Sequence, residues 1–213
     1  MIPTGSPHFS PLSLASLPAV PLDGCHQAVW EAAQKVCGGP PACRRRLIAE
    51  AHDLLALAQL SGRLIVHWLD LSAGLRAKVE MEVPVPCLPV PSGALQVAPR
   101  ALLGVIYPQP AMIMPLPGHA FVRILAPRPV WHSTVSRDPN QVLCLGPSLP
   151  AGTPLKEILL MTYGALSMQT TQLDLLDPAG VLNPAAADWW QRNPARIPLT
   201  REPFLRPKVK DGS

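Results

Sequence analysis

Proline restricts the folds open to this chain more than any other feature of the sequence. Twenty-eight of the 213 residues are proline, about 13% where ~5% is usual in proteins. A proline inside a helix removes a backbone donor and clashes with the preceding turn, so the chain cannot be a helical bundle. The hydrophobic share of 48% and the charged share of 15% still allow a substantial buried core. The length fits one domain with short appendages.

The sequence contains no pattern typical of a targeting or membrane-spanning segment. Its first residues lack the positively charged start of a signal peptide. Residues 101–122 contain no Lys, Arg, Asp or Glu, but four prolines interrupt them. They therefore cannot form a continuous helix that crosses a membrane. We expect a cytoplasmic protein without a membrane partner.

The cysteines indicate reduced thiols rather than a disulfide framework. They are five in number and include no Cys-x-x-Cys pair, so neither paired disulfides nor a common zinc motif is indicated. We expect no metal and no cofactor. The alternative is a zinc site near the N-terminus, whose ligands would be Cys25, His26, Cys37 and Cys43.

The net charge of +4 comes mainly from the C-terminal part of the chain. Six basic residues lie between Arg192 and Lys210, against Glu202 as the one acidic residue there. We expect residues 195–213 to form a solvated basic tail, with a contact to an acidic partner as the alternative. Because no aromatic-rich basic motif accompanies these charges, we expect no nucleic-acid partner.

The N-terminal part divides into an arm and two helices. Residues 1–22 are uncharged and rich in Pro and Ser, which is typical of a flexible arm. Residues 23–43 predict a short helical extension that Asp23 caps. A longer helix follows, with Arg46, Glu50 and Asp53 off its apolar stripe. The stripe has the helical period and consists of Leu47, Ile48, Ala51, Leu54, Leu55 and Ala58.

The middle of the chain predicts an antiparallel sheet. Apolar and polar residues alternate over residues 75–85, as in a strand with one face buried. Further strands are expected near residues 64–69, 101–107 and 121–125, followed by an irregular stretch over residues 126–153. Helices are then predicted from two starts, Thr153-Pro154 and Asn183-Pro184. Strands grouped between helices indicate an α+β fold.

Six short motifs, in this order, resemble the ubiquitin-conjugating enzyme family over residues 44–194. They are Pro115-Leu116-Pro117-Gly118, Phe121-Val122-Arg123-Ile124, Trp131-His132, Val142-Leu143-Cys144-Leu145, Thr153-Pro154-Leu155-Lys156-Glu157-Ile158-Leu159 and Leu182-Asn183-Pro184-Ala185-Ala186-Ala187. The resemblance implies a four-stranded antiparallel meander with an N-terminal helix and two C-terminal helices. It is closest to the divergent bacterial members found in antiphage defence operons.

The resemblance implies that Cys144 accepts a ubiquitin-like protein as a thioester from an activating enzyme and passes it to an amine on a protein target. No cofactor is required. Ser133 and Thr134 stand where the family has Pro and Asn after His132. That Asn supports the loop and the oxyanion in the family, so Thr134 or Asn140 is the expected substitute. His132 is expected to shape the loop rather than act as a base.

The resemblance also implies a contact for the first long helix and a role for a late carboxylate. The family's first helix meets the activating enzyme, so Arg44, Arg45 and Arg46 are candidates for that contact. Asp177 lies where the family often has an acidic residue near the incoming lysine, but we expect it mainly to form the turn with Pro178.

Two other interpretations remain open at this point. An inactive family member can serve as a protein-binding scaffold, and the missing Asn favours that alternative. The chain can also be an unrelated α+β interaction domain, because a lone cysteine beside Leu and Val is typical of a hydrophobic core. A thioester that forms on Cys144 separates the enzyme from both.

Overall fold

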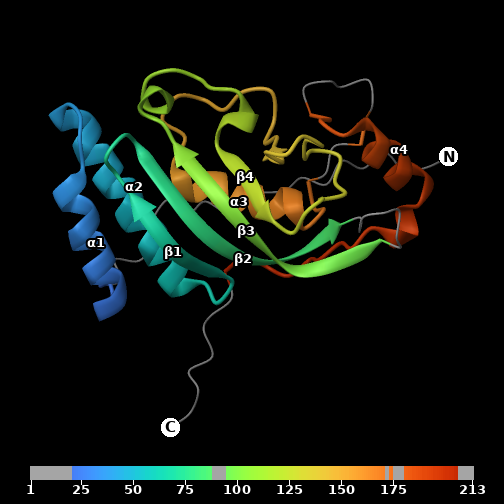
Figure 1. Ribbon diagram of the computed structural model, residues 1–213, viewed down its shortest axis with the longest axis horizontal. Helices are drawn as coiled ribbons and strands as arrows, with labels where there is room; N and C mark the ends of the chain where they lie inside the picture. Colours follow the sequence, from blue (N-terminus) through green and yellow to red (C-terminus); the bar gives the residue numbers. More distant parts are fainter. Residues whose placement is uncertain (1–20, 88–94, 171–172, 175–179, 206–213) are drawn as a thin grey trace, which may run out of the picture.

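The computed structural model describes residues 21–87, 95–170, 173–174 and 180–205 and has an α+β fold (Figure 1). Within these residues, four α-helices accompany one five-stranded antiparallel sheet. The helices are α1 (Gly24–Val36), α2 (Pro41–Leu60), α3 (Leu155–Leu166) and α4 (Pro184–Arg192). The strands are β1 (Leu64–Asp70), β2 (Leu75–Cys87), β3 (Gln96–Tyr107), β4 (Val122–Ala126) and β5 (Val142–Leu143).

The sheet is a meander in which each strand pairs with its neighbour in the sequence. The antiparallel arrangement predicted from the alternating pattern is therefore confirmed. The number of strands differs from the expected four, because the two-residue strand β5 forms inside the stretch predicted to be irregular. Backbone pairing with β4 supplies this strand, and a two-residue pattern carries no periodicity that could reveal it.

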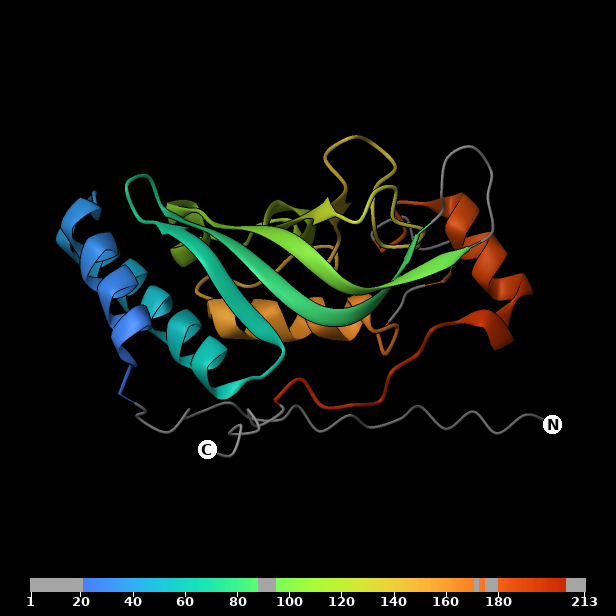
Figure 2. The same cartoon turned by 60° about the horizontal axis from the view of Figure 1, so that its bottom comes forward.

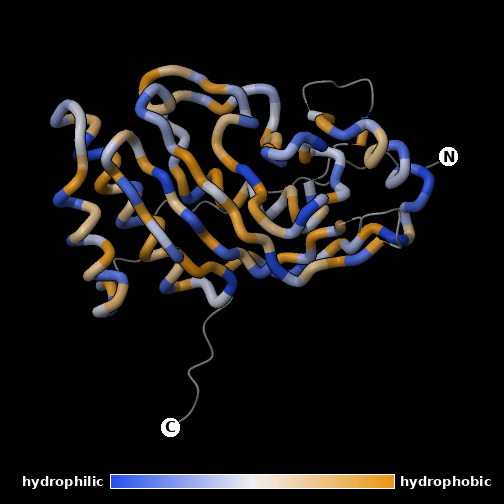
Figure 3. Tube along the Cα trace, in the orientation of Figure 1, coloured by the Kyte–Doolittle hydropathy of each residue, from blue (hydrophilic) through white to orange (hydrophobic). Residues whose placement is uncertain are grey.

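The core lies between the sheet and the helices. Along β2, every second side chain from Leu75 to Val85 is buried, and Figure 3 shows the alternation of hydrophobic and hydrophilic positions along the strands. Helix α3 lies against one face of the sheet, with α1 and α2 at one end and α4 at the other (Figure 2). Leu155, Ile158 and Leu159 of α3 belong to the main core. A smaller apolar cluster surrounds Trp190 of α4.

Helix α2 begins at Pro41, three residues before the predicted boundary of the main domain, and α1 shares the same core. Asp23 caps α1 as predicted, because its side chain accepts a hydrogen bond from the His26 amide. The prediction that Glu50 lies off the buried stripe of α2 is wrong. Only 3% of Glu50 is exposed.

Glu50 also replaces Thr153 as the group that stabilises the start of α3. Its Oε2 accepts a hydrogen bond from the Leu155 amide at 2.7 Å. The Thr153 hydroxyl donates instead to the Pro150 carbonyl at 2.8 Å. A carboxylate supplied by another helix therefore satisfies the first turn of α3, where a helix attracts negative charge.

The chain after α4 departs from the prediction of a solvated tail. Residues 197–205, named here the C-terminal strap, run back along α3 toward the start of β1 (Figure 2). The Phe204 side chain enters the main core. Burial of this aromatic ring stabilises the strap against the protein, although the charged residues beside it favour contact with solvent. Residues 206–213 and the N-terminal arm over residues 1–20 lie outside the described residues.

Among the described residues, no helix combines the length and the hydrophobicity needed to cross a membrane.

Candidate active site

Cys144 lies at the end of a small hairpin formed by residues 134–144, named here the Cys144 hairpin. Its amide donates to the Thr134 carbonyl at 2.8 Å, and the Ser136 amide donates to Val142 at 2.9 Å. Between these bonds, Val135 pairs with Leu143 and both side chains are fully buried. The Cys144 thiol donates to the Gly146 carbonyl at 3.3 Å. The residue is 5% exposed.

His132 anchors this hairpin to the end of α3. Its Nε2–H donates to the Ala165 carbonyl at 3.0 Å, which leaves Nδ1 as an acceptor. The Thr134 amide and hydroxyl both donate to that Nδ1, at 3.2 and 3.0 Å. Complete burial lowers the pKa of His132 to about 4, so the ring is neutral at pH 7. Both nitrogens of the neutral ring are therefore hydrogen-bonded, and the ring links the loop to α3.

The two candidate substitutes for the family's Asn lie in different positions. The Thr134 hydroxyl proton is directed to His132 Nδ1 and is therefore not available to Cys144. Asn140 is exposed at the turn of the hairpin, where its amide donates to Asp138 Oδ1 at 2.7 Å. Cys144 lies at the opposite end of the hairpin from this turn, because its amide pairs with Thr134. The structure therefore brings His132, Thr134 and Cys144 together, and Asn140 lies apart from them.

The segment before β4 packs directly against the residues that follow Cys144. It includes the 3-10 helix η2 (Gly118–Ala120), whose first carbonyl accepts from the Leu145 amide at 3.4 Å. A Cβ atom added to Gly118 would lie 2.3 Å from the Gly146 carbonyl oxygen. Gly146 itself has a φ of +116°, a conformation that side chains disfavour. These two glycines set the path of the backbone beside the thiol, and the sequence motifs gave no signal of their contact.

The start of α4 completes the same region. Leu182 and Asn183 both donate their amides to the Ser133 carbonyl, at 2.9 and 2.8 Å. The Asn183 side chain caps α4 by accepting from the Ala186 amide at 3.1 Å, as the sequence predicts. Two motifs about fifty residues apart in the sequence are thereby joined next to the Cys144 hairpin. Asp177 lies outside the described residues.

The three arginines proposed for partner binding differ in their environments. Arg44 and Arg45 are exposed on α2. Arg46 instead pairs with Glu50 at 2.6 Å and donates to the Gly152 carbonyl at 3.0 Å. Burial raises the pKa of Glu50 above its usual value, although Arg46 and the Leu155 amide oppose the shift. Arg46 therefore connects α2 to the segment before α3, whereas Arg44 and Arg45 are exposed.

The zinc alternative finds no support in the described part of the chain, which contains all four of its ligands. Within that part, no three His, Cys, Asp or Glu side chains lie together so that they could hold a metal ion. His26 Nδ1 bonds instead to Asp23 at 2.8 Å. The five cysteines form no disulfide.

Comparison of the chain with models of protein families, with curated proteins and with solved structures gave no match. The function is therefore inferred from the residues and their geometry.

Proposed function

We propose that this protein is a ubiquitin-conjugating-like enzyme with the corresponding fold, in which Cys144 carries a ubiquitin-like protein as a thioester. The observation that carries the proposal is the arrangement around His132. This residue joins the Cys144 hairpin to α3, and the Leu182-Asn183 segment is bonded to the next residue, Ser133. Four of the six motifs, those that contain Gly118, His132, Cys144 and Asn183, therefore lie together around Cys144. They are distributed over more than fifty residues of sequence.

The proposed reaction has two steps. The Cys144 thiolate attacks the carbonyl carbon of a thioester between the ubiquitin-like C-terminus and a cysteine of the activating enzyme. A new carbon–sulfur bond forms, and the old one breaks to release the activating enzyme's thiolate, which takes up the proton lost by Cys144. A target amine then attacks the same carbon, forms an amide and releases the Cys144 thiolate, while the amine proton passes to solvent. We place this reaction in the bacterial cytoplasm, in antiphage conjugation.

The site suits the first step better than the second. Thiolate exchange has a good leaving group and needs little further help. Attack by an amine depends on donors aimed at the developing oxyanion, and the loss of one donor costs about 2.7–4 kcal/mol. The Thr134 hydroxyl bonds to His132, and the Cys144 amide bonds to Thr134. We therefore expect fast charging and slow discharge onto free lysine, with a target or a second subunit that completes the site.

The test is a charging assay with the activating enzyme, ATP and the ubiquitin-like protein, analysed on non-reducing gels. The parent should form a thiol-sensitive adduct, Cys144→Ala should form none, and Cys144→Ser should form a slower, thiol-resistant oxyester. Cys87→Ala is the matched control, because this half-buried thiol lies at the end of β2, and it should charge as the parent does.

Two results would refute the enzymatic proposal. An adduct that persists in Cys144→Ala would mean that another cysteine carries the thioester. A parent that binds the ubiquitin-like protein without forming any adduct would favour the inactive scaffold.

A further inference from the structure

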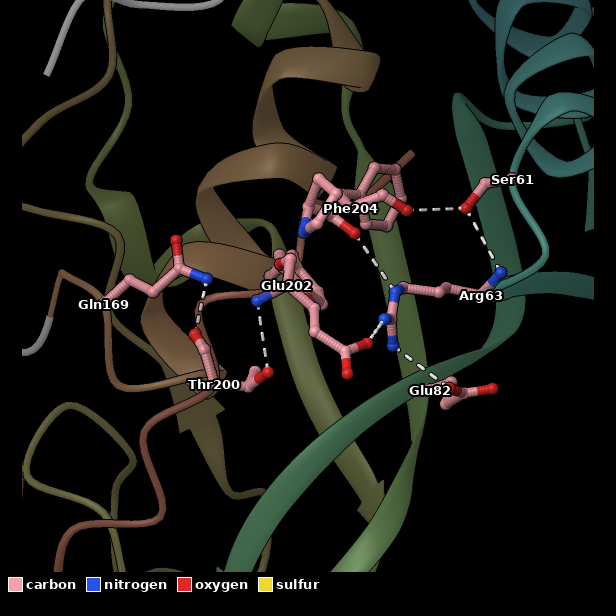
Figure 4. Close-up of polar contacts among 9 residues, drawn as sticks. Ser61, Arg63, Glu82, Gln169, Thr200, Glu202 and Phe204 are labelled. Carbon is pink, nitrogen blue, oxygen red and sulfur yellow. Dashed lines mark hydrogen bonds and ion pairs between the residues drawn. The ribbon is translucent and has the colours of Figure 1, made fainter. Parts of the chain in front are cut away.

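The C-terminal strap is bonded to the residues that directly follow α3. The Thr200 amide donates to the Ser167 carbonyl at 3.3 Å. In the other direction, the Gln169 side-chain amide donates to the Thr200 carbonyl at 2.8 Å. These two bonds join one strap residue to the segment that ends the helix, and Figure 4 shows the bond between Gln169 and Thr200.

The far end of the strap is fixed by an aromatic anchor. The Phe204 ring is buried, with its centre 5.3 Å from that of Tyr163 on α3. The Phe204 carbonyl accepts from the Ser61 hydroxyl at 2.9 Å, and the Tyr163 hydroxyl donates to the Glu202 carbonyl at 2.8 Å. The strap thus runs along α3 and reaches the junction between α2 and β1.

A buried arginine adds an electrostatic anchor. Arg63 is 5% exposed, and its guanidinium pairs with Glu82 of β2 at 3.0 Å and with Glu202 of the strap. It also donates to the Pro203 carbonyl at 3.1 Å. A buried guanidinium is destabilising unless it is paired and hydrogen-bonded. Because the strap supplies one of its two carboxylates, strap release would leave Arg63 with weaker compensation (Figure 4).

The last turn of α3 holds the Cys144 hairpin. The Ala165 carbonyl accepts a hydrogen bond from the His132 ring. Two residues further on, the Ser167 carbonyl accepts a hydrogen bond from the Thr200 amide of the strap. From His132 the bonds continue to Thr134, and the Thr134 carbonyl receives the Cys144 amide. The strap and the thiol are therefore connected through one helical turn.

We infer that the C-terminal strap positions the Cys144 hairpin. With the strap docked, the end of α3 is fixed and presents the Ala165 carbonyl to His132. With the strap released, that turn loses two hydrogen bonds and the hairpin opens more often, which exposes Cys144. This conformational effect does not depend on thioester chemistry. Its consequence, that strap docking governs access to the reactive thiol, rests on the proposed function.

The experiment measures how fast iodoacetamide alkylates each cysteine, with mass spectrometry to identify the modified residue. It uses the full chain alone and needs neither an activating enzyme nor a ubiquitin-like protein. Phe204→Ala removes the anchor of the strap. We expect Cys144 alkylation to rise about tenfold, the factor that corresponds to about 1.4 kcal/mol of lost docking energy. Phe204→Leu, which keeps apolar volume, should restore most of the parent rate.

Two internal controls separate local opening from general unfolding. Cys37 is 7% exposed and lies just after α1, at the other end of the fold, so its alkylation reports general unfolding. Leu199→Ala changes a half-exposed residue of the same strap and should leave all rates unchanged. A parallel rise at Cys37 and Cys144 in Phe204→Ala would overturn the inference, and so would an unchanged rate at Cys144.

Discussion

Replacement of Gly118 by alanine tests whether the segment before β4 sets the backbone beside Cys144. The added Cβ would lie 2.3 Å from the Gly146 carbonyl oxygen and 2.8 Å from the Gly146 nitrogen, where real Cβ contacts begin near 3.0 Å. All the atoms concerned belong to the backbone, so no side-chain rotation can relieve the overlap. One of the two segments must move by about 0.7 Å, and overpacking of this kind costs about 1–3 kcal/mol.

Urea denaturation measures this cost as a lower midpoint at an unchanged slope. For a chain of this size, each kcal/mol also lowers the melting temperature by about 2–4 °C. Because the displaced residues directly follow Cys144, we expect charging by the activating enzyme to slow as well.

Gly24→Ala is the matched control for the Gly118 substitution. Its added Cβ meets nothing within 4 Å at the first residue of α1. Alanine is a better helix former than glycine, so stability should stay the same or rise by up to ~1 kcal/mol. A Gly118→Ala protein as stable and as readily charged as the parent would refute the close approach of Gly118 to Gly146.

Three further predictions concern the buried polar groups and the arginines. The folded pKa of His132, about 4, lies below its usual 6.5, so the unfolded state takes up a proton first as pH falls. The contribution of the neutral His132 ring to stability is complete above pH 6.5, and about 2 kcal/mol of it is lost between pH 7 and 5. Urea denaturation should show this loss in the parent and not in His132→Gln. Equal losses in the two proteins would contradict the buried neutral ring. Arg46→Ala leaves the Glu50 carboxylate without its cation and should lower stability by about 1–3 kcal/mol. Charge reversal at Arg44 and Arg45 should change stability by less than about 0.5 kcal/mol but slow charging in a salt-dependent way, and a charging rate unaffected at every salt concentration would exclude them from partner binding.

Local patterns in the sequence determined the class of fold. The alternation along β2 indicates a half-buried strand because side-chain direction reverses at each residue. Asp23 and Asn183 cap their helices within three residues of sequence, so the amino-acid order alone reveals them. The same holds for the apolar stripe of α2. The proximity of His132 and Cys144 was expected only from the resemblance of ordered motifs, since no periodicity connects a histidine and a cysteine twelve residues apart.

Only the tertiary structure decided which distant groups satisfy one another. Glu50 stabilises the start of a helix 105 residues later, and Ser61 binds Phe204 across 143 residues. Neither contact can be recognised from the neighbouring residues in the sequence, because the two partners are far apart along the chain. The close approach of Gly118 to Gly146 is of the same kind. Backbone propensity depends on a few adjacent residues, whereas these contacts depend on how whole helices and strands pack. This packing determines both the position of the strap and the surroundings of Cys144.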